Sequence, residues 1–553
     1  MLKTRLVSSM EKCFLDSDIV AFPIYQKCTA AREMQTSFQL LVQETDTRGI
    51  DKKLLANLRF SGDLAPYTAV RSVDYIPSEM PVYGGGYDDN YLRTTPGLYP
   101  DLLQNLHYDN RLRMHSGHMR SLWFDIMIPK DAPIEAGEHA LTIEILSNEE
   151  VLATEVFTLH LLDTVLPEQD FPLTQWFHCD CLASYYNVPV FSERHWEIIE
   201  SFARTAVKNG ISMLLTPVFT PPLDTHVGGE RPTVQLVDVT VTNGVYTFGY
   251  EKLDRWIEMC NRVGIRYFEI SHLFTQWGAE HAPKIIATVD GVEKRIFGWE
   301  TDATGDDYIS FLNAFLSDFL AHMKARGDDK RCYYHVSDEP HPDHLDNYGK
   351  AKNVISTHLR DYVLMDALGN YAFYENGLVE TPVVASNKID IFLENKVPTL
   401  WVYYCCGQMR GTSNRFFAMP GWRTRFMGIQ MYYHDVKGFL QWGYNFYYNQ
   451  GSYDLINPYM ETSGEYFAPS GDTFSVYPAA DGTALESIRI VQFREGLDDM
   501  RLCRYAEALC GREAVISAIE SIFGKVSFSE CPYSAKPILK LRERLFAMIR
   551  AKL

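Results

Sequence analysis

Two adjacent carboxylates, Asp338 and Glu339, follow an apolar run at residues 333–336 that has the composition of a buried strand. Successive strand side chains point to opposite faces, so neighbouring acids can share one space only beyond the strand's end. Pro340 helps to break the strand, and the pattern from Asp343 onward predicts a helix. In a barrel of parallel strands such a loop lies on the face that carries active sites. The alternative is that one acid caps the next helix or pairs with a surface arginine.

Length and charge limit the partners. A chain of 553 residues exceeds what one core usually serves, so two or three domains are expected. Its 71 acidic and 52 basic residues give a net charge of −19. This charge argues against nucleic acid and anionic membranes as partners, because both would be repelled.

Signals for export or for metal binding are missing from the sequence. The N-terminal segment has no apolar core of about 7–15 residues before Glu11, so it does not resemble a signal peptide. No apolar run approaches the ~18 residues that span a bilayer. The 11 cysteines include no C-x-x-C spacing, which predicts reduced thiols in a cytoplasmic protein without a zinc site or another cofactor.

Residues 1–167 predict an antiparallel β-sandwich. Apolar and polar residues alternate around Phe38, Leu40 and Val42 and again around Leu141 and Ile143, with glycine-rich turns between the runs. No helix is predicted between residues 76 and 165. Short alternating strands with turn signals are typical of a sandwich.

Residues 168–512 predict a (β/α)8 barrel, because strand-like runs alternate there with helical patterns. The runs lie at 173–178, 212–217, 266–272, 331–336, 362–365, 382–386, 399–405 and 438–444, and the clearest helical faces at 196–206, 253–263 and 308–323. A hairpin within 222–246 is expected over the barrel mouth. The last barrel helix should run from 485 to about 509, and residues 513–553 predict C-terminal helices packed on the barrel. A doubly wound open sheet is the rival, but no glycine-rich nucleotide loop supports it.

Polar and aromatic residues gather at the predicted strand ends, which is the outline of a sugar site. Aromatic rings stack on the C–H faces of pyranoses while acids act on the glycosidic oxygen. The candidate substrate-binding residues are His178, Asp180, His272, Trp277, His335, Tyr403, Trp442 and Asn445. Each aromatic residue alone could equally belong to the core.

Other chemistries have weaker signatures. Glu339, His341, Asp343 and His344 are donor types that suit zinc or iron, but they lack the H-E-x-x-H spacing and would need strained geometry. No G-x-S-x-G element is present for a serine hydrolase. Cys179 could act as a nucleophile only beside an activating base. No metal is therefore predicted.

Five segments together resemble glycoside hydrolase family 123. They are 175–182 (QWFHCDCL), 219–225 (FTPPLDT), 274–278 (FTQWG), 335–340 (HVSDEP) and 438–445 (GFLQWGYN). The resemblance covers about residues 170–510, and a β-sandwich in front of the barrel fits the family's architecture. Motifs of this length, in this order, are specific for the superfamily and less so for the substrate.

The resemblance implies a retaining β-N-acetylgalactosaminidase that needs no enzyme nucleophile. In this family the substrate's 2-acetamido oxygen attacks the anomeric carbon and forms an oxazoline. By resemblance, Asp338 would orient the acetamide N–H, and Glu339 would protonate the leaving oxygen and later activate water. The negative charge of Asp338 would help Glu339 to hold its proton.

The sequence therefore predicts a cytoplasmic exo-β-N-acetylhexosaminidase that acts on oligosaccharides or glycoconjugates with a terminal N-acetylhexosamine. Two alternatives stay open. A glycosidase for sugars without an acetamido group would need a carboxylate nucleophile, for which Asp180 and Glu269 are the strand-end candidates. A non-catalytic carbohydrate-binding protein would bind glycans without turnover.

Overall fold

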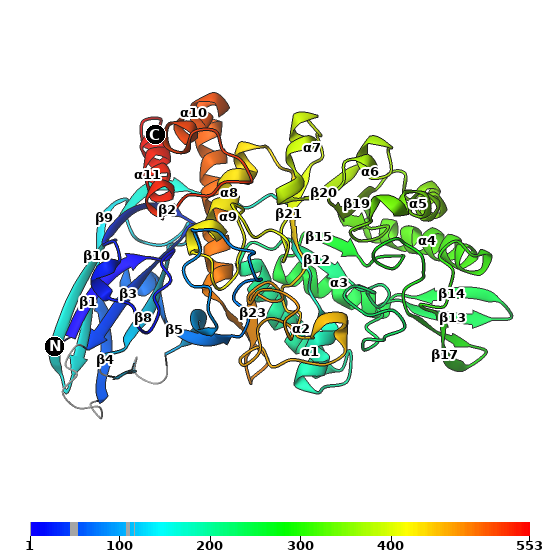
Figure 1. Cartoon of the computed structure of the whole chain (residues 1–553), viewed down its shortest axis with the longest axis horizontal. Helices are drawn as coiled ribbons and strands as arrows, with labels where there is room; N and C mark the ends of the chain where they lie inside the picture. Colours follow the sequence, from blue (N-terminus) through cyan, green and yellow to red (C-terminus); the bar gives the residue numbers. More distant parts are fainter. Residues whose placement is uncertain (1, 45–52, 107–110, 116) are drawn as a thin grey trace.

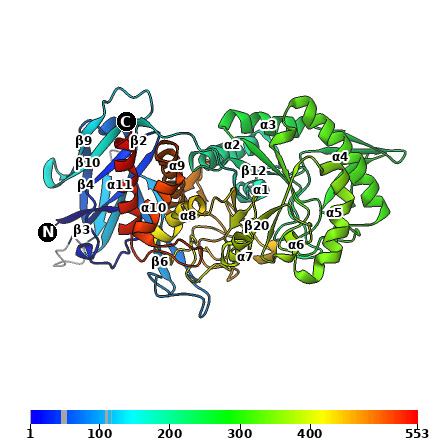
Figure 2. The same cartoon turned by 90° about the horizontal axis from the view of Figure 1, so that it is seen from above.

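The computed structural model describes residues 2–44, 53–106, 111–115 and 117–553. Figures 1 and 2 show β-sheets from the N-terminal part at one end of the molecule and a ring of strands and helices at the other. Both ends of the chain lie in the half that holds the sheets, because the C-terminal helices return to it (Figure 1).

The N-terminal part, up to residue 165, is a β-sandwich, as predicted. One sheet has the strand order β1-β3-β8-β5-β6 and the other β2-β10-β9-β4-β7. The strands are β1 Leu2–Ser8, β2 Lys27–Arg32, β3 Gln35–Glu44, β4 Lys53–Ser61, β5 Thr68–Ser78, β6 Gly97–Asn105, β7 Arg111–His115, β8 Met119–Met127, β9 Gly137–Ser147 and β10 Glu150–Val165. Pairing is antiparallel except between β2 and β10, which run parallel. Between the sheets, the ring of Phe38 stacks on those of Phe124 and Phe157.

Strand β3 is buried on both faces, although its sequence alternates. Its apolar side chains face the sandwich core, while Gln39 donates hydrogen bonds to two backbone carbonyls. The helix α9 (Ile488–Cys510) packs against the same sheet, where Glu495 accepts a hydrogen bond from the backbone N–H of Ser37. The polar side chains of β3 therefore contact other parts of the protein and are not exposed to water.

The C-terminal part forms a closed barrel of eight parallel strands, which confirms the predicted fold class. The strands are β11 Leu173–Gln175, β12 Met213–Thr216, β15 Tyr267–Ile270, β18 Cys332–Tyr334, β19 Val363–Leu368, β20 Thr381–Ala385, β21 Trp401–Tyr403 and β22 Gly438–Gln441. Each lies within or overlaps one of the eight predicted runs. The barrel closes where β22 pairs with β11.

Helices surround the barrel and follow its strands. They are α1 Cys179–Tyr186, α2 Glu193–Lys208, α3 Glu251–Val263, α4 Asp306–Arg326, α5 Leu345–Leu359, α6 Ala372–Glu375, α7 Asp390–Glu394 and α8 Gly421–Tyr433. The apolar faces predicted at 196–206, 253–263 and 308–323 are the buried faces of α2, α3 and α4. Ser192 caps α2 by accepting a hydrogen bond from the backbone N–H of His195, which stabilises the first turn.

Two inserted hairpins form a separate four-stranded sheet in the order β14-β13-β16-β17. The strands are β13 Asp238–Thr242, β14 Val245–Gly249, β16 Ile285–Val289 and β17 Val292–Phe297. The hairpin predicted within 222–246 lies later in the chain, and Tyr246 and Phe248 pack on Phe311 of α4. The second hairpin was not predicted. The segment of the insertion that reaches the site is the one before β13.

The last barrel helix is α9, close to the prediction, and α10 (Arg512–Phe523) and α11 (Lys536–Arg550) follow it. A short antiparallel pair, β23 (Val476–Pro478) and β24 (Ala484–Glu486), precedes α9. The helix α11 contacts both α9 and β2, where Thr29 donates hydrogen bonds to Glu543. A buried ion pair between Arg489 of α9 and Asp101 of β6 (2.7 Å) joins the C-terminal part of the chain to the sandwich.

Among the described residues, no helix combines the length and the apolar character that a bilayer crossing requires.

Candidate active site

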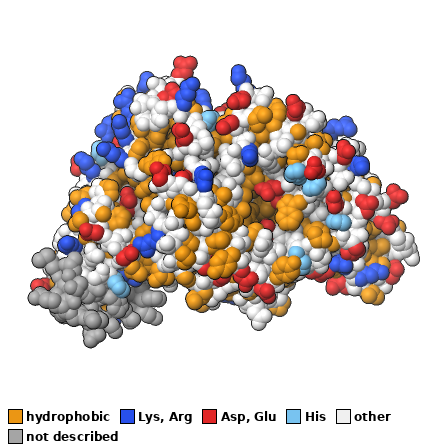
Figure 3. Space-filling view, in the orientation of Figure 1, with side chains coloured by type: hydrophobic (Ala, Val, Ile, Leu, Met, Phe, Trp, Pro, Cys, Tyr) orange, Lys and Arg blue, Asp and Glu red, His pale blue; other side chains and the backbone are white. Residues whose placement is uncertain are grey.

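Asp338 and Glu339 lie in the loop after β18, the fourth barrel strand. Asp338 is half-buried, whereas Glu339 is exposed. The phenol of Tyr403, at the end of β21, donates a hydrogen bond to Oε1 of Glu339 (2.5 Å). The space-filling view shows a recess lined by hydrophobic side chains near the place where Figure 1 draws β15 and β21 (Figure 3). The two acids thus lie beyond the C-terminal end of the fourth barrel strand, and Glu339 is open to solvent.

The backbone at Glu339 has an unusual conformation. Its φ of 41° lies in the left-handed region, which costs free energy for a residue other than glycine. The backbone N–H of Glu339 donates a hydrogen bond to the carbonyl of Ala367 on β19 (3.0 Å). This bond to the neighbouring strand helps to hold the strained turn that separates the two acids.

A buried charged network lies below this loop. His335 contacts two carboxylates, with Nδ1 3.0 Å from Oδ1 of Asp366 and Nε2 2.7 Å from Oε1 of Glu269. His335 directly follows β18, Asp366 lies in β19 and Glu269 lies in β15, and all three side chains are at most 1% exposed. Hydrogen bonds to Asp366 and Glu269 raise the pKa of His335 to about 10 against the opposing effect of burial. His335 is therefore an imidazolium that donates from both ring nitrogens.

Asp366 connects this network to the loop of the two acids. Its carboxylate accepts hydrogen bonds from the backbone N–H groups of Val336 (3.2 Å) and Ser337 (3.3 Å) and from the hydroxyl of Tyr348. Val336 and Ser337 directly precede Asp338. The position of the acid pair therefore depends on a carboxylate from the next strand.

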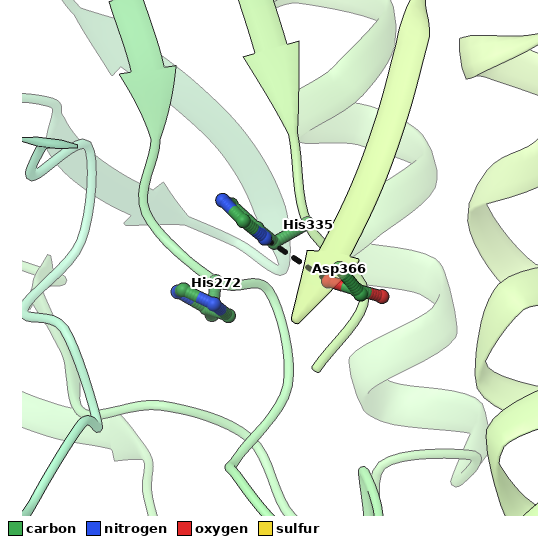
Figure 4. A group of neighbouring side chains, drawn as sticks. All are labelled: His272, His335 and Asp366. Carbon is green, nitrogen blue, oxygen red and sulfur yellow. Dashed lines mark hydrogen bonds and ion pairs between the residues drawn. The ribbon is translucent and has the colours of Figure 1, made fainter. Parts of the chain in front are cut away.

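His272, His335 and Asp366 are close enough to be considered as metal ligands, with candidate atoms within 4.8 Å of one another (Figure 4). The ring of His272 stacks on that of His335 (centroids 4.1 Å apart) and is 1% exposed, and neither of its nitrogens has a hydrogen-bond partner among the described residues. Both nitrogens of His335 already bind carboxylates, so this residue has no free lone pair for a metal. The group fits an ion-pair network better than a metal centre.

The alternative metal cluster does not form a site either. His341 and Asp343 pair with each other (3.1 Å), and their side chains are 66% and 86% exposed. The ring of His344 faces the loop at Gly278, while Glu339 binds Tyr403. These four residues do not converge on one point.

A third carboxylate, Asp224, belongs to the same electrostatic environment. It lies in the segment after β12, is half-buried, and has a positive φ of 48°. Burial and the charges of Glu339 and Asp472 raise the pKa of Asp224 to about 7, although Arg231 opposes the shift. Burial, then the charges of Glu339 and Asp224, raise the pKa of Asp338 well above its usual value. The raised pKa of Asp338 thus reflects its burial among neighbouring carboxylates.

The raised pKa of Asp338 predicts a measurable cost to stability. The pKa of this carboxyl group is about 3.9 in the unfolded chain and higher in the folded protein, so above pH 3.9 its ionisation favours the unfolded state. We expect Asp338→Asn to raise the melting temperature by on the order of 1–2 °C at pH 7, with the difference vanishing below about pH 3. Thermal unfolding followed by circular dichroism at both pH values measures this.

Asp343→Asn is the matched control, because Asp343 lies in the same loop with its side chain 86% exposed. It should leave the melting temperature unchanged at both pH values. An Asp338→Asn protein that is less stable than the wild type at pH 7 would contradict this prediction.

His178, Asp180 and Asn445 are held by contacts within the protein. Asp180 forms a two-bond ion pair with Arg231 (2.7 Å each), and Arg231 also contacts Nδ1 of His178. Asn445 accepts from the backbone N–H and donates to the backbone carbonyl of His178. Burial and Arg231 lower the pKa of His178 to about 3, so it is neutral. These three residues hold the first and eighth strand ends and the inserted segment together.

The aromatic candidates differ in their accessibility. Trp277 is 51% exposed, whereas Tyr403 and Trp442 are 6% and 9% exposed. The indole N–H of Trp442 donates to Oδ2 of Asp472 (2.9 Å), and its ring contacts the ring of Phe446. The backbone of Trp277 binds Asp338 and the phenol of Tyr403 binds Glu339, whereas Trp442 is buried and contacts other residues of the protein.

Sequence reasoning missed several residues of the site. Asp366 lies one residue beyond the fifth predicted run, which ended at residue 365, so a longer run would have placed it at a strand end. Asp224 lies inside one of the segments that carry the family resemblance. Arg231 comes from the insertion, and nothing in the sequence indicated that it reaches Asp180.

Comparison with known families decides the identity of this barrel. The family description "Glycoside hydrolase 123, catalytic domain" matches residues 176–506, which is more than half of the chain. This chain belongs to glycoside hydrolase family 123. It is accordingly a glycoside hydrolase, and its Asp338 and Glu339 lie at the mouth of the matched domain. Comparison with curated protein sequences gave no match.

A solved structure resembles this family 123 member over its whole length. A family 123 glycoside hydrolase from Clostridium perfringens, whose structural analysis concerns glycolipid glycan hydrolysis, has a TM-score of 0.76 at 15% identity, with 100% of this chain and 99% of that chain covered. A Bacteroides vulgatus protein described as a proposed glycoside hydrolase gives a TM-score of 0.33 at 9% identity, covering 87% of this chain and 79% of that one. At this identity the first comparison shows a shared fold.

Proposed function

We propose that this protein is a retaining exo-β-N-acetylhexosaminidase that prefers terminal β-N-acetylgalactosamine and uses the substrate's own acetamido group as the nucleophile. The observation that supports this best is the pair of adjacent acids with unequal environments, Asp338 half-buried and Glu339 exposed. A substrate that supplies its own nucleophile needs one acid for proton transfer and one group to bind the acetamide.

In this proposal Glu339 is the general acid and base. Tyr403 donates to Oε1 of Glu339, so the acidic proton is carried by Oε2. That proton passes to the glycosidic oxygen as the acetamide oxygen attacks the anomeric carbon and the bond to the leaving group breaks. Glu339 then removes a proton from the water that opens the oxazoline, which restores the sugar with its configuration retained.

Asp338 stabilises the positive charge that develops on the acetamide. In the empty site, burial and two neighbouring carboxylates make its negative charge unfavourable, which is why its pKa is raised. A positively charged acetamide N–H offsets that cost. The interaction is therefore stronger in the transition state than with the neutral substrate, as catalysis requires.

The acetamido-independent alternative has one observation in its favour. Asp180 is held by Arg231, and Glu269 accepts hydrogen bonds from Trp176 and His335, so neither is free to attack a sugar. The carboxylate of Asp224 accepts no hydrogen bond from the described residues, and the charge of Glu339 helps to raise its pKa. A double-displacement mechanism would use Asp224 as its nucleophile.

A panel of aryl β-glycosides with and without the 2-acetamido group separates the two mechanisms. We expect hydrolysis of the N-acetylgalactosaminide and N-acetylglucosaminide, and inhibition by a thiazoline analogue of the oxazoline with a Kd of about 1 μM or below. Hydrolysis of the plain β-galactoside with no effect of the thiazoline would favour Asp224 as nucleophile. Binding of these sugars without any turnover would overturn both mechanisms.

A further inference from the structure

Trp277 is a large aromatic residue whose exposure needs an explanation. Its side chain is 51% exposed, and it makes no ring contact with another described residue. An exposed indole leaves a large, flat apolar surface in water, which a stacking partner could cover. Its neighbours in the same motif, Phe274 and Thr275, are buried.

The backbone that presents Trp277 is strained over three consecutive residues. Trp277 (φ 59°), Gly278 (φ 147°) and Ala279 (φ 57°) all have positive φ angles. For Trp and Ala this conformation is unfavourable, and such strain persists only where the surroundings impose it. This backbone conformation costs free energy, and the side chain that it carries is not packed in the core.

Two hydrogen bonds fix this loop to the loop of the catalytic pair. The backbone N–H of Trp277 donates to the carbonyl of Asp338 (2.9 Å), and the hydroxyl of Ser337 donates to the carbonyl of Thr275 (2.9 Å). A Cβ on Gly278 would lie 3.3 Å from the ring of His344, so the loop also packs closely against the turn that follows the acids. The backbone that carries the indole is thus fixed next to that of Asp338.

The different exposures of Asp338, Glu339 and Trp277 indicate how a bound oligosaccharide would be oriented. Asp338 is half-buried, Glu339 is exposed, and Trp277, whose backbone binds that of Asp338, is exposed too. If Asp338 binds the acetamide of the terminal sugar and Glu339 protonates the leaving oxygen, the next sugar of the chain must lie further out.

We propose that Trp277 forms the floor of the aglycone subsite and stacks on the apolar face of the pyranose ring that leaves. This inference rests on the proposed function. Its ligand is a second sugar ring, because a flat, half-exposed indole matches the C–H face of a pyranose and has no charge or donor array for a phosphate or a peptide. The site would then favour oligosaccharides over simple glycosides.

The test compares two substrates that share the terminal sugar. One is a disaccharide of β-N-acetylgalactosamine linked to galactose, and the other is the methyl glycoside. We expect kcat/KM of the wild type to be about tenfold higher for the disaccharide and Trp277→Ala to remove this preference. Trp277→Phe should restore most of it. Alanine keeps a Cβ at the same strained φ, so the variant tests the ring and not the backbone.

Two controls isolate the subsite. Inhibition by the thiazoline, which fills only the terminal-sugar position, should be unchanged in Trp277→Ala. Tyr533→Ala removes another aromatic residue of similar exposure (65%) far along the chain and should leave the substrate preference intact. Equal losses on both substrates, or no loss on either, would overturn the subsite.

A binding measurement keeps this result separate from the proposed function. In the Glu339→Gln protein, calorimetry should show about tenfold tighter binding of the disaccharide than of N-acetylgalactosamine, and Trp277→Ala should abolish that difference. If the wild type hydrolyses neither substrate but this difference is present, the proposed function fails and the subsite stands. If both sugars bind equally, or neither binds, the subsite is overturned.

Discussion

Glu339→Gln will lower kcat/KM by about 10²–10⁴-fold for substrates with a poor leaving group, such as a sugar or methanol. The glutamine keeps the shape of the side chain but has no proton to give to the glycosidic oxygen. A dinitrophenyl leaving group needs no protonation, so the formation of the oxazoline should be much less affected with that substrate. Steady-state kinetics on a series of leaving groups of decreasing pKa measures the difference.

Tyr403→Phe is a suitable comparison for this variant. It removes the hydrogen bond to Oε1 of Glu339 but leaves the carboxyl group in place. We expect a smaller loss of activity that remains sensitive to the leaving group. If Glu339→Gln lowers kcat/KM equally for poor and activated leaving groups, Glu339 is not the general acid.

Asp366→Asn is expected to lower both stability and activity, because it removes one of the two charges that hold the His335 imidazolium. Breaking a buried ion pair typically costs about 3–5 kcal/mol of unfolding free energy. The backbone N–H groups of Val336 and Ser337 would also lose a charged acceptor, so the loop that carries Asp338 should be less well positioned. Urea unfolding and the kcat of the folded enzyme measure the two effects.

The loss of stability in Asp366→Asn should depend on pH in a defined direction. The pKa of His335 is raised to about 10 in the folded protein, against about 6.5 in the unfolded chain. Its protonation therefore stabilises the fold fully below about pH 6.5, and this contribution is lost as the pH rises toward 10. The difference in unfolding free energy between wild type and Asp366→Asn should be largest near pH 6 and shrink by pH 10.

Two variants show whether Asp366 acts through position as well as stability. Tyr348→Phe removes one neutral hydrogen bond to the same carboxylate and should cost less stability with little change in kcat. Asp254→Asn breaks an ion pair with Arg326 on the outside of the barrel and should leave kcat unchanged. An Asp366→Asn enzyme with normal kcat at a temperature where it is fully folded would contradict the positioning role.

Much of the fold could be predicted from the sequence, because its signals are local. Each barrel strand is a short apolar run, and α2, α3 and α4 show the spacing of one buried helical face. The β16–β17 hairpin was missed because its outer strand, β17, is mostly exposed and has no apolar alternation. The alternating sequence of β3 suggests a strand with one exposed face, because no local pattern indicates that α9 covers that face.

The sequence by itself determined the order of the eight barrel strands, the place of Asp338 and Glu339 beyond the fourth of them, and the family. These depend on residue types at fixed spacings, which act through local conformation and hydrophobic burial. Only the tertiary structure decided which carboxylates meet. The contacts of His335 with Asp366 and Glu269 join residues 31 and 66 positions apart, and Arg231 reaches Asp180 across 51.

The same holds for the properties that give each acid its role. A pKa depends on burial and on nearby charges, so at Asp338 only the effect of the adjacent Glu339 could be read from the sequence, whereas burial and the charge of Asp224 come from the fold. The exposure of Trp277 depends on a strained loop that is held by the backbone of Asp338. Closure of the barrel brings these distant segments together, and this is why the chemistry of the site appears only in the folded chain.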